Sequence, residues 1–236
     1  MRTKPYHPVV LSILRQHGAR VVLDMPCGSG WLGQAVAAGK LQLDALDGLG
    51  LWEFPAADLP YRHVREHDLD TPLAGAAGYD AIVCAEAIHL LRNPGLMLDG
   101  AFRALRPGGR LILTTPNTWR VGSRLAYLTR GFHYGFSPMV GKRRGDYVTY
   151  VPWSFPQLHL FLAHQGFGEI VLHEVDEPKP KYLVEHLAGL PARAYCRSHE
   201  RAASSADERD YWRQAGSRQA LYGRWLVMSA RRPAQG

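Results

Sequence analysis

The sequence predicts an α/β fold, and three observations lead to this prediction. A short apolar run at residues 21–25 is typical of a buried strand, and a glycine turn and a helical stretch at 31–38 follow it. Apolar runs and helical stretches then alternate along most of the chain, as in parallel sheets whose strands are joined by helices. The 236 residues, 46% of them hydrophobic, fit one globular domain over 1–236.

The turn after the first strand predicts a ligand site. The strand ends at Asp24, and Pro26, Cys27, Gly28 and Gly30 form the turn. Glycines let a ligand approach the backbone, and the helix that follows offers unpaired N–H groups. A strand, a glycine turn and a helix are together typical of sites for nucleotide-like ligands, although two glycines alone also occur in turns that bind nothing.

The run LDMPCGSG at residues 23–30 resembles LDxGCGxG, the first motif of the class I S-adenosylmethionine-dependent methyltransferases. The run LRPGGRLILTTPN at 105–117 is similar to the turn and fifth strand of that family. The resemblance covers about residues 20–176 and resumes at the last strand. It implies a Rossmann-like, doubly wound sheet of seven strands in the order 3-2-1-4-5-7-6, with the last strand antiparallel. It also implies S-adenosyl-L-methionine as cofactor and S-adenosyl-L-homocysteine as product.

The remaining elements follow from periodicity. Apolar residues at helical spacing predict a helix at 8–16 that ends at Gly18. In the family such a helix covers the cofactor, so either Tyr6 or His7 lines the pocket or the helix only packs. Residues 50–59 are poorly periodic and predict a broken helix. Strands are expected at 41–46, 61–66, 79–84, 110–115, 169–175 and 224–230, and further helices at 93–105, 121–129 and 153–165.

The family resemblance assigns cofactor contacts to the carboxyl ends of the first four strands. Asp47 and Gly48 follow the expected second strand, where a carboxylate accepts from the ribose hydroxyls; a surface-turn role is the alternative. The other expected cofactor residues are Asp68 and Leu69 at the adenine, Ala85 and Glu86 after the fourth strand, and Asp24, Pro26, Cys27, Gly28 and Gly30 in the turn. Pro26 replaces the family's first glycine and has no N–H, so one backbone contact to the cofactor's amino-acid end is lost.

His89 is the candidate catalytic residue. It lies three positions after Glu86, so on a helical turn the two share a face at the ligand edge of the sheet. A histidine there has a suitable pKa to accept the acceptor's proton, and the alternative is a histidine that packs a short helix. The segment resembles the metal-binding ExxEH of the ubiquinone-pathway methyltransferases. Its second acid is replaced by His89 and its histidine by Leu90, so no metal is predicted.

Two insertions depart from the minimal fold. We expect residues 118–150 to form a lid over the acceptor, with Asn117, His133, Tyr134 and Tyr147 facing it. Lys142, Arg143 and Arg144 either meet an anionic part of the acceptor or form a solvated loop tip. Residues 177–222, rich in arginine, are expected to be mostly helical.

These features predict a methyltransferase that acts on an oxygen of a small-molecule, glycan or lipid-linked acceptor. The net charge of +7 keeps an RNA acceptor as one alternative, and Pro26 with the incomplete ExxEH keeps a non-catalytic cofactor-binding module as another. The three cysteines form no CxxC, which favours the cytoplasm. No apolar run of about 18 residues predicts a membrane span, which leaves peripheral membrane contact open. The acceptor's identity and the oligomeric state are not predicted.

Overall fold

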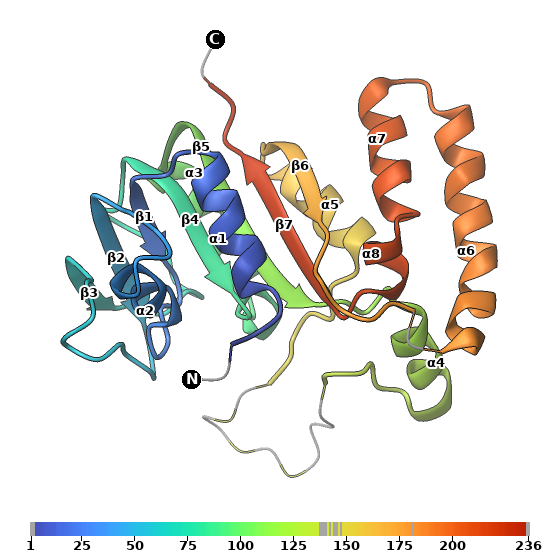
Figure 1. Cartoon of the computed structure of the whole chain (residues 1–236), viewed down its shortest axis with the longest axis horizontal. Coiled ribbons are helices and arrows are strands. Elements are labelled where there is room, and N and C mark those ends of the chain that lie inside the picture. The colour runs from blue at the N-terminus through green and yellow to red at the C-terminus, as the bar shows by residue number, and fades with distance from the viewer. Residues whose placement is uncertain are drawn as a thin grey trace.

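The computed structural model describes residues 3–136, 141, 143, 146, 148–180 and 182–234, and it contains a seven-stranded sheet with the order β3-β2-β1-β4-β5-β7-β6 (Figure 1). The strands β1 to β5 pair in parallel, whereas β7 runs antiparallel to both β5 and β6. The predicted order and the antiparallel last strand are confirmed. The strands are β1 (Val21–Asp24), β2 (Ala45–Gly50), β3 (His63–Glu66), β4 (Tyr79–Ala85), β5 (Leu105–Pro116), β6 (Gly168–His173) and β7 (Trp225–Arg231).

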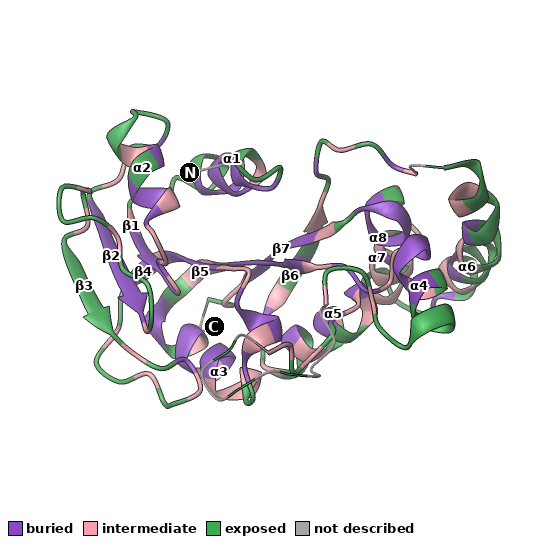
Figure 2. Ribbon diagram, turned by 90° about the horizontal axis from the view of Figure 1, so that it is seen from below, coloured by how far each residue is buried: buried purple, intermediate pink, exposed green. Residues whose placement is uncertain are grey.

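Helices cover both faces of this sheet (Figure 2). On one face lie α1 (His7–Gln16) and α2 (Trp31–Ala37), and on the other lie α3 (Pro94–Ala104) and α5 (Phe155–His164). Successive strand residues point to opposite faces, so the buried strands supply two cores. Ile112 of β5 belongs to the core under α1, whereas its neighbour Leu113 belongs to the core under α3 and α5.

The helices of the two insertions lie beyond the β7–β6 edge of the sheet, those of the second insertion beside the strands and that of the first insertion lower (Figure 1). The first contains α4 (Val121–Arg130), and the second contains α6 (Leu183–Ala202), α7 (Ala206–Ala215) and α8 (Arg218–Tyr222). Ser205 and Ser217 cap α7 and α8 by accepting from backbone N–H groups. None of the helices within the described residues is long and apolar enough to cross a membrane.

Two expectations about local structure are wrong. The second strand is Ala45–Gly50 rather than 41–46, because its parallel pairing with β1 begins at Val21 and Ala45. Residues 51–60 form turns and irregular structure instead of a broken helix. This stretch contains Pro55 and Pro60, which have no N–H to donate, and it folds back over the glycine turn.

Candidate functional site

The candidate site lies where β1 and β4 end side by side in the middle of the sheet. From β1 the chain continues to β2 on one side, and from β4 it continues to β5 on the other. Ligands of open α/β sheets bind at such a switch point, outside the carboxyl ends of the strands. Asp24 is the last residue of β1, and Glu86 directly follows β4, so the sheet brings the two carboxylates to this edge.

The glycine turn connects β1 to α2, and its glycines have different constraints. Gly28 and Gly30 have φ angles of +48° and +83°, a region that side chains rarely adopt. A Cβ on Gly30 would lie 2.6 Å from Leu59 and 2.7 Å from Pro55, so this glycine is needed for packing. A Cβ on Gly28 would have only the Glu53 carboxylate within 4 Å, at 3.5 Å. Gly28 therefore borders the open side of the turn.

Asp24 is a buried carboxyl group with unused hydrogen-bonding capacity. It is 0% exposed and accepts from the Tyr61 hydroxyl at 2.7 Å, while its Oδ1 has no partner among the described residues. Burial raises the pKa of Asp24 to about 7, against the opposite effect of the Tyr61 bond. A positively charged ligand would favour the ionised form and supply the missing partner.

Glu86 has a similar environment on the neighbouring strand. Its carboxylate accepts from Thr114 Oγ1 at 3.3 Å, and burial raises its pKa to about 7, partly offset by this bond and by Lys4. Its φ of +58° is unusual for a residue with a side chain and costs about 1–3 kcal/mol. Glu86 thus combines a strained backbone with a half-buried carboxyl group of raised pKa at the edge of the sheet where ligands bind.

The start of α1 closes this side of the site. The His7 ring stacks on Trp31, the first residue of α2, with 4.1 Å between ring centroids. Tyr6 packs edge-on against Trp225 at 5.3 Å, and its pKa is raised by burial and by the nearby Glu86 carboxylate. Both side chains are buried, so α1 packs against the site, and only the Tyr6 hydroxyl reaches its polar groups.

The structure corrects the placement of Asp47. Because β2 extends to Gly50, Asp47 lies inside the strand and not at its end. Its Oδ2 accepts from the Tyr79 hydroxyl at 2.8 Å, and Arg62 donates to both carboxylate oxygens at 3.0 and 2.6 Å. Burial opposes ionisation, but these bonds outweigh it and lower the pKa of Asp47. Its carboxylate holds β2, β3 and β4 together and is 6% exposed.

Glu53 is the residue that sequence reasoning missed. It is exposed in the segment after β2, with its carboxylate beside Gly28. It is the first acid after the true end of β2, so correct strand bounds would have identified it.

The other expected cofactor residues lie around the same edge. Asp68 is exposed after β3, where its Oδ1 accepts from the Asp70 N–H, and Leu69 beside it is buried. Gly48 packs closely on Cys27, whose buried thiol has its pKa raised to about 12 by burial. Ala85 ends β4, and Pro26 lies at the start of the turn.

His89 does not share a face with Glu86. It lies in the short 3₁₀ helix η1 (Ile88–Leu90), and its Nδ1 is 3.1 Å from Thr115 Oγ1, whereas Glu86 bonds to the adjacent Thr114. Because consecutive strand residues point to opposite faces, the two side chains lie on opposite sides of β5. The expected pairing was wrong because the chain turns sharply at Glu86 instead of starting a helix.

His89 nevertheless contacts the first insertion. The backbone oxygen of His89 accepts from the Tyr150 N–H at 2.9 Å, and the centroid of its ring lies 6.1 Å from that of Phe136. Burial lowers the pKa of His89 to about 4, so the imidazole is neutral at pH 7.

The expected acceptor residues divide into three groups. His133 and Tyr134 lie together, with Ser123 Oγ within 3.2 Å of both His133 Nδ1 and the Tyr134 nitrogen. The Asn117 amide is buried and donates to Ala220 and Gly223, while its oxygen accepts from Trp119, so it joins β5 to the second insertion and faces no acceptor. Tyr147, Lys142 and Arg144 lie outside the described residues. Arg143 is described, and its N–H donates to Asp146.

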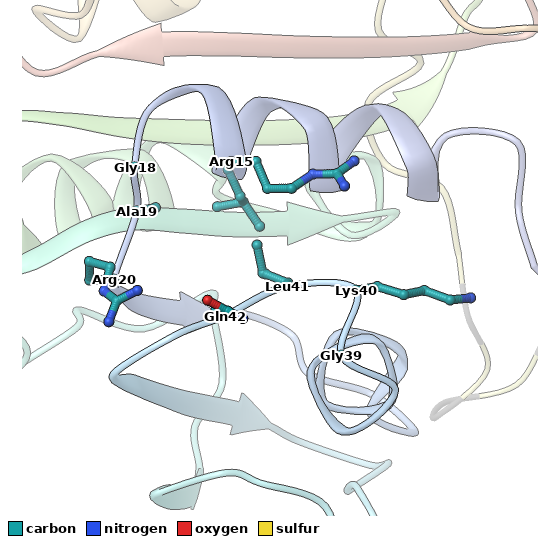
Figure 3. A pocket seen from close by; sticks show the side chains of 9 residues that line it. Arg15, Gly18, Ala19, Arg20, Gly39, Lys40, Leu41 and Gln42 are labelled. Atoms are coloured by element: carbon teal, nitrogen blue, oxygen red, sulfur yellow. The ribbon is translucent and has the colours of Figure 1, made fainter.

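Two other features of the described residues bear on where a ligand could bind. Within that part of the chain, no group of three or more His, Cys, Asp and Glu side chains could hold a metal ion. A cavity of about 330 Å³ lies between the end of α1 and the loop before β2, lined by Arg15, Arg20 and Lys40 among others (Figure 3). It opens at the amino ends of the strands, opposite to the ligand edge, and Arg20 is already paired with Asp44 at 2.5 Å.

Comparisons with known proteins agree with this geometry. A methyltransferase domain family matches residues 7–159. A ubiquinone biosynthesis O-methyltransferase of Xylella fastidiosa is 30% identical over 180 residues, which are 69% of each chain. Another protein of that name, from Psychrobacter arcticus, is 31% identical over 107 residues, covering 41% of this chain and 40% of that one.

Solved structures share the fold at low sequence identity. An S-adenosylmethionine-dependent methyltransferase from Mesorhizobium loti superposes with a TM-score of 0.53 and 17% identity, over 97% of this chain and 98% of that one. A putative S-adenosylmethionine-dependent methyltransferase from Listeria monocytogenes gives a TM-score of 0.54 and 15% identity, over 98% of each chain.

The strand order, the glycine turn and the family match define a methyltransferase. The S-adenosylmethionine that the sequence resemblance implies carries an ammonium and a sulfonium, and the buried Asp24 Oδ1 and the half-buried Glu86 carboxyl suit these positive charges. The chain belongs to the methyltransferase domain family.

Proposed function

We propose that this methyltransferase acts on a hydroxyl oxygen of a small-molecule, glycan or lipid-linked acceptor. The observation that carries the proposal is a neutral, buried His89 at the carboxyl end of β4, between Thr115 and the first insertion. A hydroxyl must lose its proton as it is methylated, and a neutral imidazole can accept it. The relatives named as O-methyltransferases support an oxygen acceptor.

The cofactor supplies an activated methyl group, so the protein's main task is to align acceptor, methyl and sulfur. In the proposed site Gly28 lets the amino-acid end approach the backbone, and Asp24 and Glu86 face its positive charges. Glu53 takes the ribose role first assigned to Asp47, because its carboxylate lies beside Gly28. The adenine contact is assigned to Asp68 and Leu69, which follow β3.

His89 acts in the tautomer whose Nδ1–H donates to Thr115 Oγ1, which leaves Nε2 to accept the proton. Because its pKa is about 4, the ring is already unprotonated at neutral pH and is free to accept a proton. His133 and Tyr134 of the first insertion are the proposed acceptor contacts beside it. Tyr147 stays a prediction, and Asn117 is withdrawn because its amide is occupied.

The experiment is a methyl-transfer assay with labelled S-adenosylmethionine on cell extract separated into lipid, glycan, small-molecule, RNA and protein fractions. We expect label in a lipid, glycan or small-molecule fraction with wild type and strongly reduced label with His89→Ala. Label in the RNA fraction would replace the proposal with the RNA alternative. Label lost on mild base treatment, as from a carboxyl ester, would contradict a hydroxyl acceptor.

A further inference from the structure

The first half of α6 has an inverted distribution of side chains. Its half-buried positions include Glu185, His186 and Arg193, whereas its exposed positions are apolar or aromatic. A helix that packs on a protein core shows the opposite pattern. The exposed residues between 182 and 195 are Tyr182, Leu183, Val184, Leu187, Ala188, Leu190, Pro191, Ala194 and Tyr195.

The neighbouring α4 buries Val121 and Ala126 but also exposes large apolar side chains. Leu125, Tyr127 and Leu128 are 38%, 51% and 80% exposed. Arg124, on the same helix, points inward over the Trp119 ring at 4.5 Å, and its Nε and Nη2 are buried with no partner among the described residues. Exposed leucines beside an arginine with buried nitrogens are unfavourable in water and are typical of a surface that contacts a partner.

The two helices lie next to each other. A Cβ on Gly122 of α4 would collide with the carboxylate of Glu185 on α6, so the helices touch at their first turns (Figure 1). We call the exposed apolar residues of both helices, together with Phe132, the apolar surface. In the second half of α6 the exposed residues become polar, with Arg197, Ser198 and Arg201, so the apolar surface is confined to the end near α4.

The charged residues around the apolar surface indicate which kind of partner could bind there. In residues 119–135 and 182–198 the only acid is Glu185, and the cations are Arg120, Arg124, Arg130, Arg193 and Arg197. A symmetric pairing of two copies would bring arginines against arginines, which is unfavourable. A partner with an apolar interior and a negatively charged rim fits better, and an anionic lipid surface has this composition.

The apolar surface also lies next to the candidate acceptor side of the molecule. The α4 helix begins five residues after Pro116, the last residue of β5, and its Ser123 contacts His133 and Tyr134 of the proposed acceptor site. Tyrosines such as Tyr127, Tyr134 and Tyr182, all more than half exposed, are residues that favour the boundary between headgroups and lipid tails.

We propose that the apolar surface of α4 and α6 docks the protein reversibly on an anionic lipid membrane. The leucines enter the headgroup region, and the exposed Arg130 and Arg197 meet the lipid phosphates. This contact is separate from methyl transfer, since none of its leucines touches the cofactor or acceptor residues assigned above.

The test is co-sedimentation of the full chain with vesicles of phosphatidylcholine alone, or of phosphatidylcholine with about one third phosphatidylglycerol. We expect wild type to bind the anionic vesicles, and to bind them less at high salt because the arginine contribution is screened. The variant Leu128→Gln/Leu183→Gln/Leu187→Gln should lower the partition coefficient at least about tenfold. The matched control is Leu160→Gln, which changes a leucine of α5 that is 59% exposed outside the apolar surface and should bind like wild type.

Three results would overturn the proposal. The first is wild type that stays in solution with anionic vesicles, and the second is a Leu160→Gln loss as large as that of the triple variant. The third is a wild-type dimer that the triple variant converts to monomer without any vesicle binding, which would make the apolar surface a contact between copies. Binding of S-adenosylhomocysteine, measured without vesicles, checks that each variant is folded, and its loss in wild type would contradict the proposed function and not the docking.

Discussion

Two regions of this molecule distribute their side chains in opposite ways. From β1 to β4 apolar residues are buried in the cores on both faces of the sheet, and carboxyl groups gather at one edge. In α4 and the first half of α6 leucines and tyrosines are exposed, while Arg124 and Arg193 are half-buried. The first region is organised around its own core and a small ligand, and the second is organised for a partner outside the chain.

The largest effect is expected at His89. Removing a general base costs about 10²–10⁴ in rate, so His89→Ala should lower kcat by that factor and leave S-adenosylhomocysteine affinity unchanged. Because the pKa of His89 is lowered to about 4, the wild-type rate should be flat above about pH 6 and fall only as the pH approaches 4. The measurement is kcat against pH. His159→Ala, which removes a half-buried histidine on α5, is the control and should retain its rate. Near-normal turnover of His89→Ala would move the base to His133 or Tyr134.

The glycine turn is expected to control cofactor binding. Gly28→Val should weaken S-adenosylhomocysteine binding about 100-fold or more, because the side chain would enter the open space beside Glu53. The matched control is Gly18→Val, at a similar φ of +58° with no neighbour within 4 Å, which brings the same backbone strain far from the site. Both variants should lose about 1–3 kcal/mol of stability, but calorimetry should show lost binding only for Gly28→Val. Equal binding by the two variants would contradict the site.

Glu53 and Asp47 should have separable roles. Glu53→Gln should weaken cofactor binding by about 1–3 kcal/mol without changing the melting temperature, because its carboxylate is exposed. Asp47→Ala should lower the free energy of unfolding by a similar amount and leave cofactor binding almost unchanged in the folded protein, because it removes the acceptor of Tyr79 and Arg62. Calorimetric titration measures cofactor binding by both variants, and thermal melting measures their stability. Weakened binding by Asp47→Ala with unchanged binding by Glu53→Gln would restore Asp47 as the ribose ligand.

The smallest effect concerns pH and the buried carboxyls. The pKa values of Asp24 and Glu86 are raised to about 7 in the free protein, and a cationic ligand favours their ionised forms. S-adenosylmethionine affinity should therefore rise by at most about tenfold per group over the whole interval from pH 6 to 8, with protons released on binding. Titration in buffers of different ionisation enthalpy measures this release. Glu86→Gln should reduce it, and an unchanged release would leave Asp24 as the sole source.

Part of the fold and of the candidate site could be predicted from the sequence, and part could not. The run from Val21 to Gly30 and the alternation of strands and helices predicted the sheet, because periodicity and turn residues act locally. The end of β2 was misplaced by four residues, since an apolar run at 41–46 does not reveal where pairing with β1 begins. The expected strand end led to the ribose role being predicted for Asp47, whose carboxylate is bound by Arg62 and Tyr79 in the structure.

The sequence by itself determined the strands and helices along the chain, the glycine turn, one helix in the first insertion and the mostly helical second insertion, since each depends on neighbouring residues. The strand order within the sheet was expected from the family resemblance. Only the tertiary structure decided that Glu53 lies beside Gly28 and that Glu86 and His89 lie on opposite faces of β5. It also decided that α4 and α6 expose their leucines. The physical reason is that strand register and helix rotation are set by distant partners, and a shift of one strand residue reverses the face of every side chain.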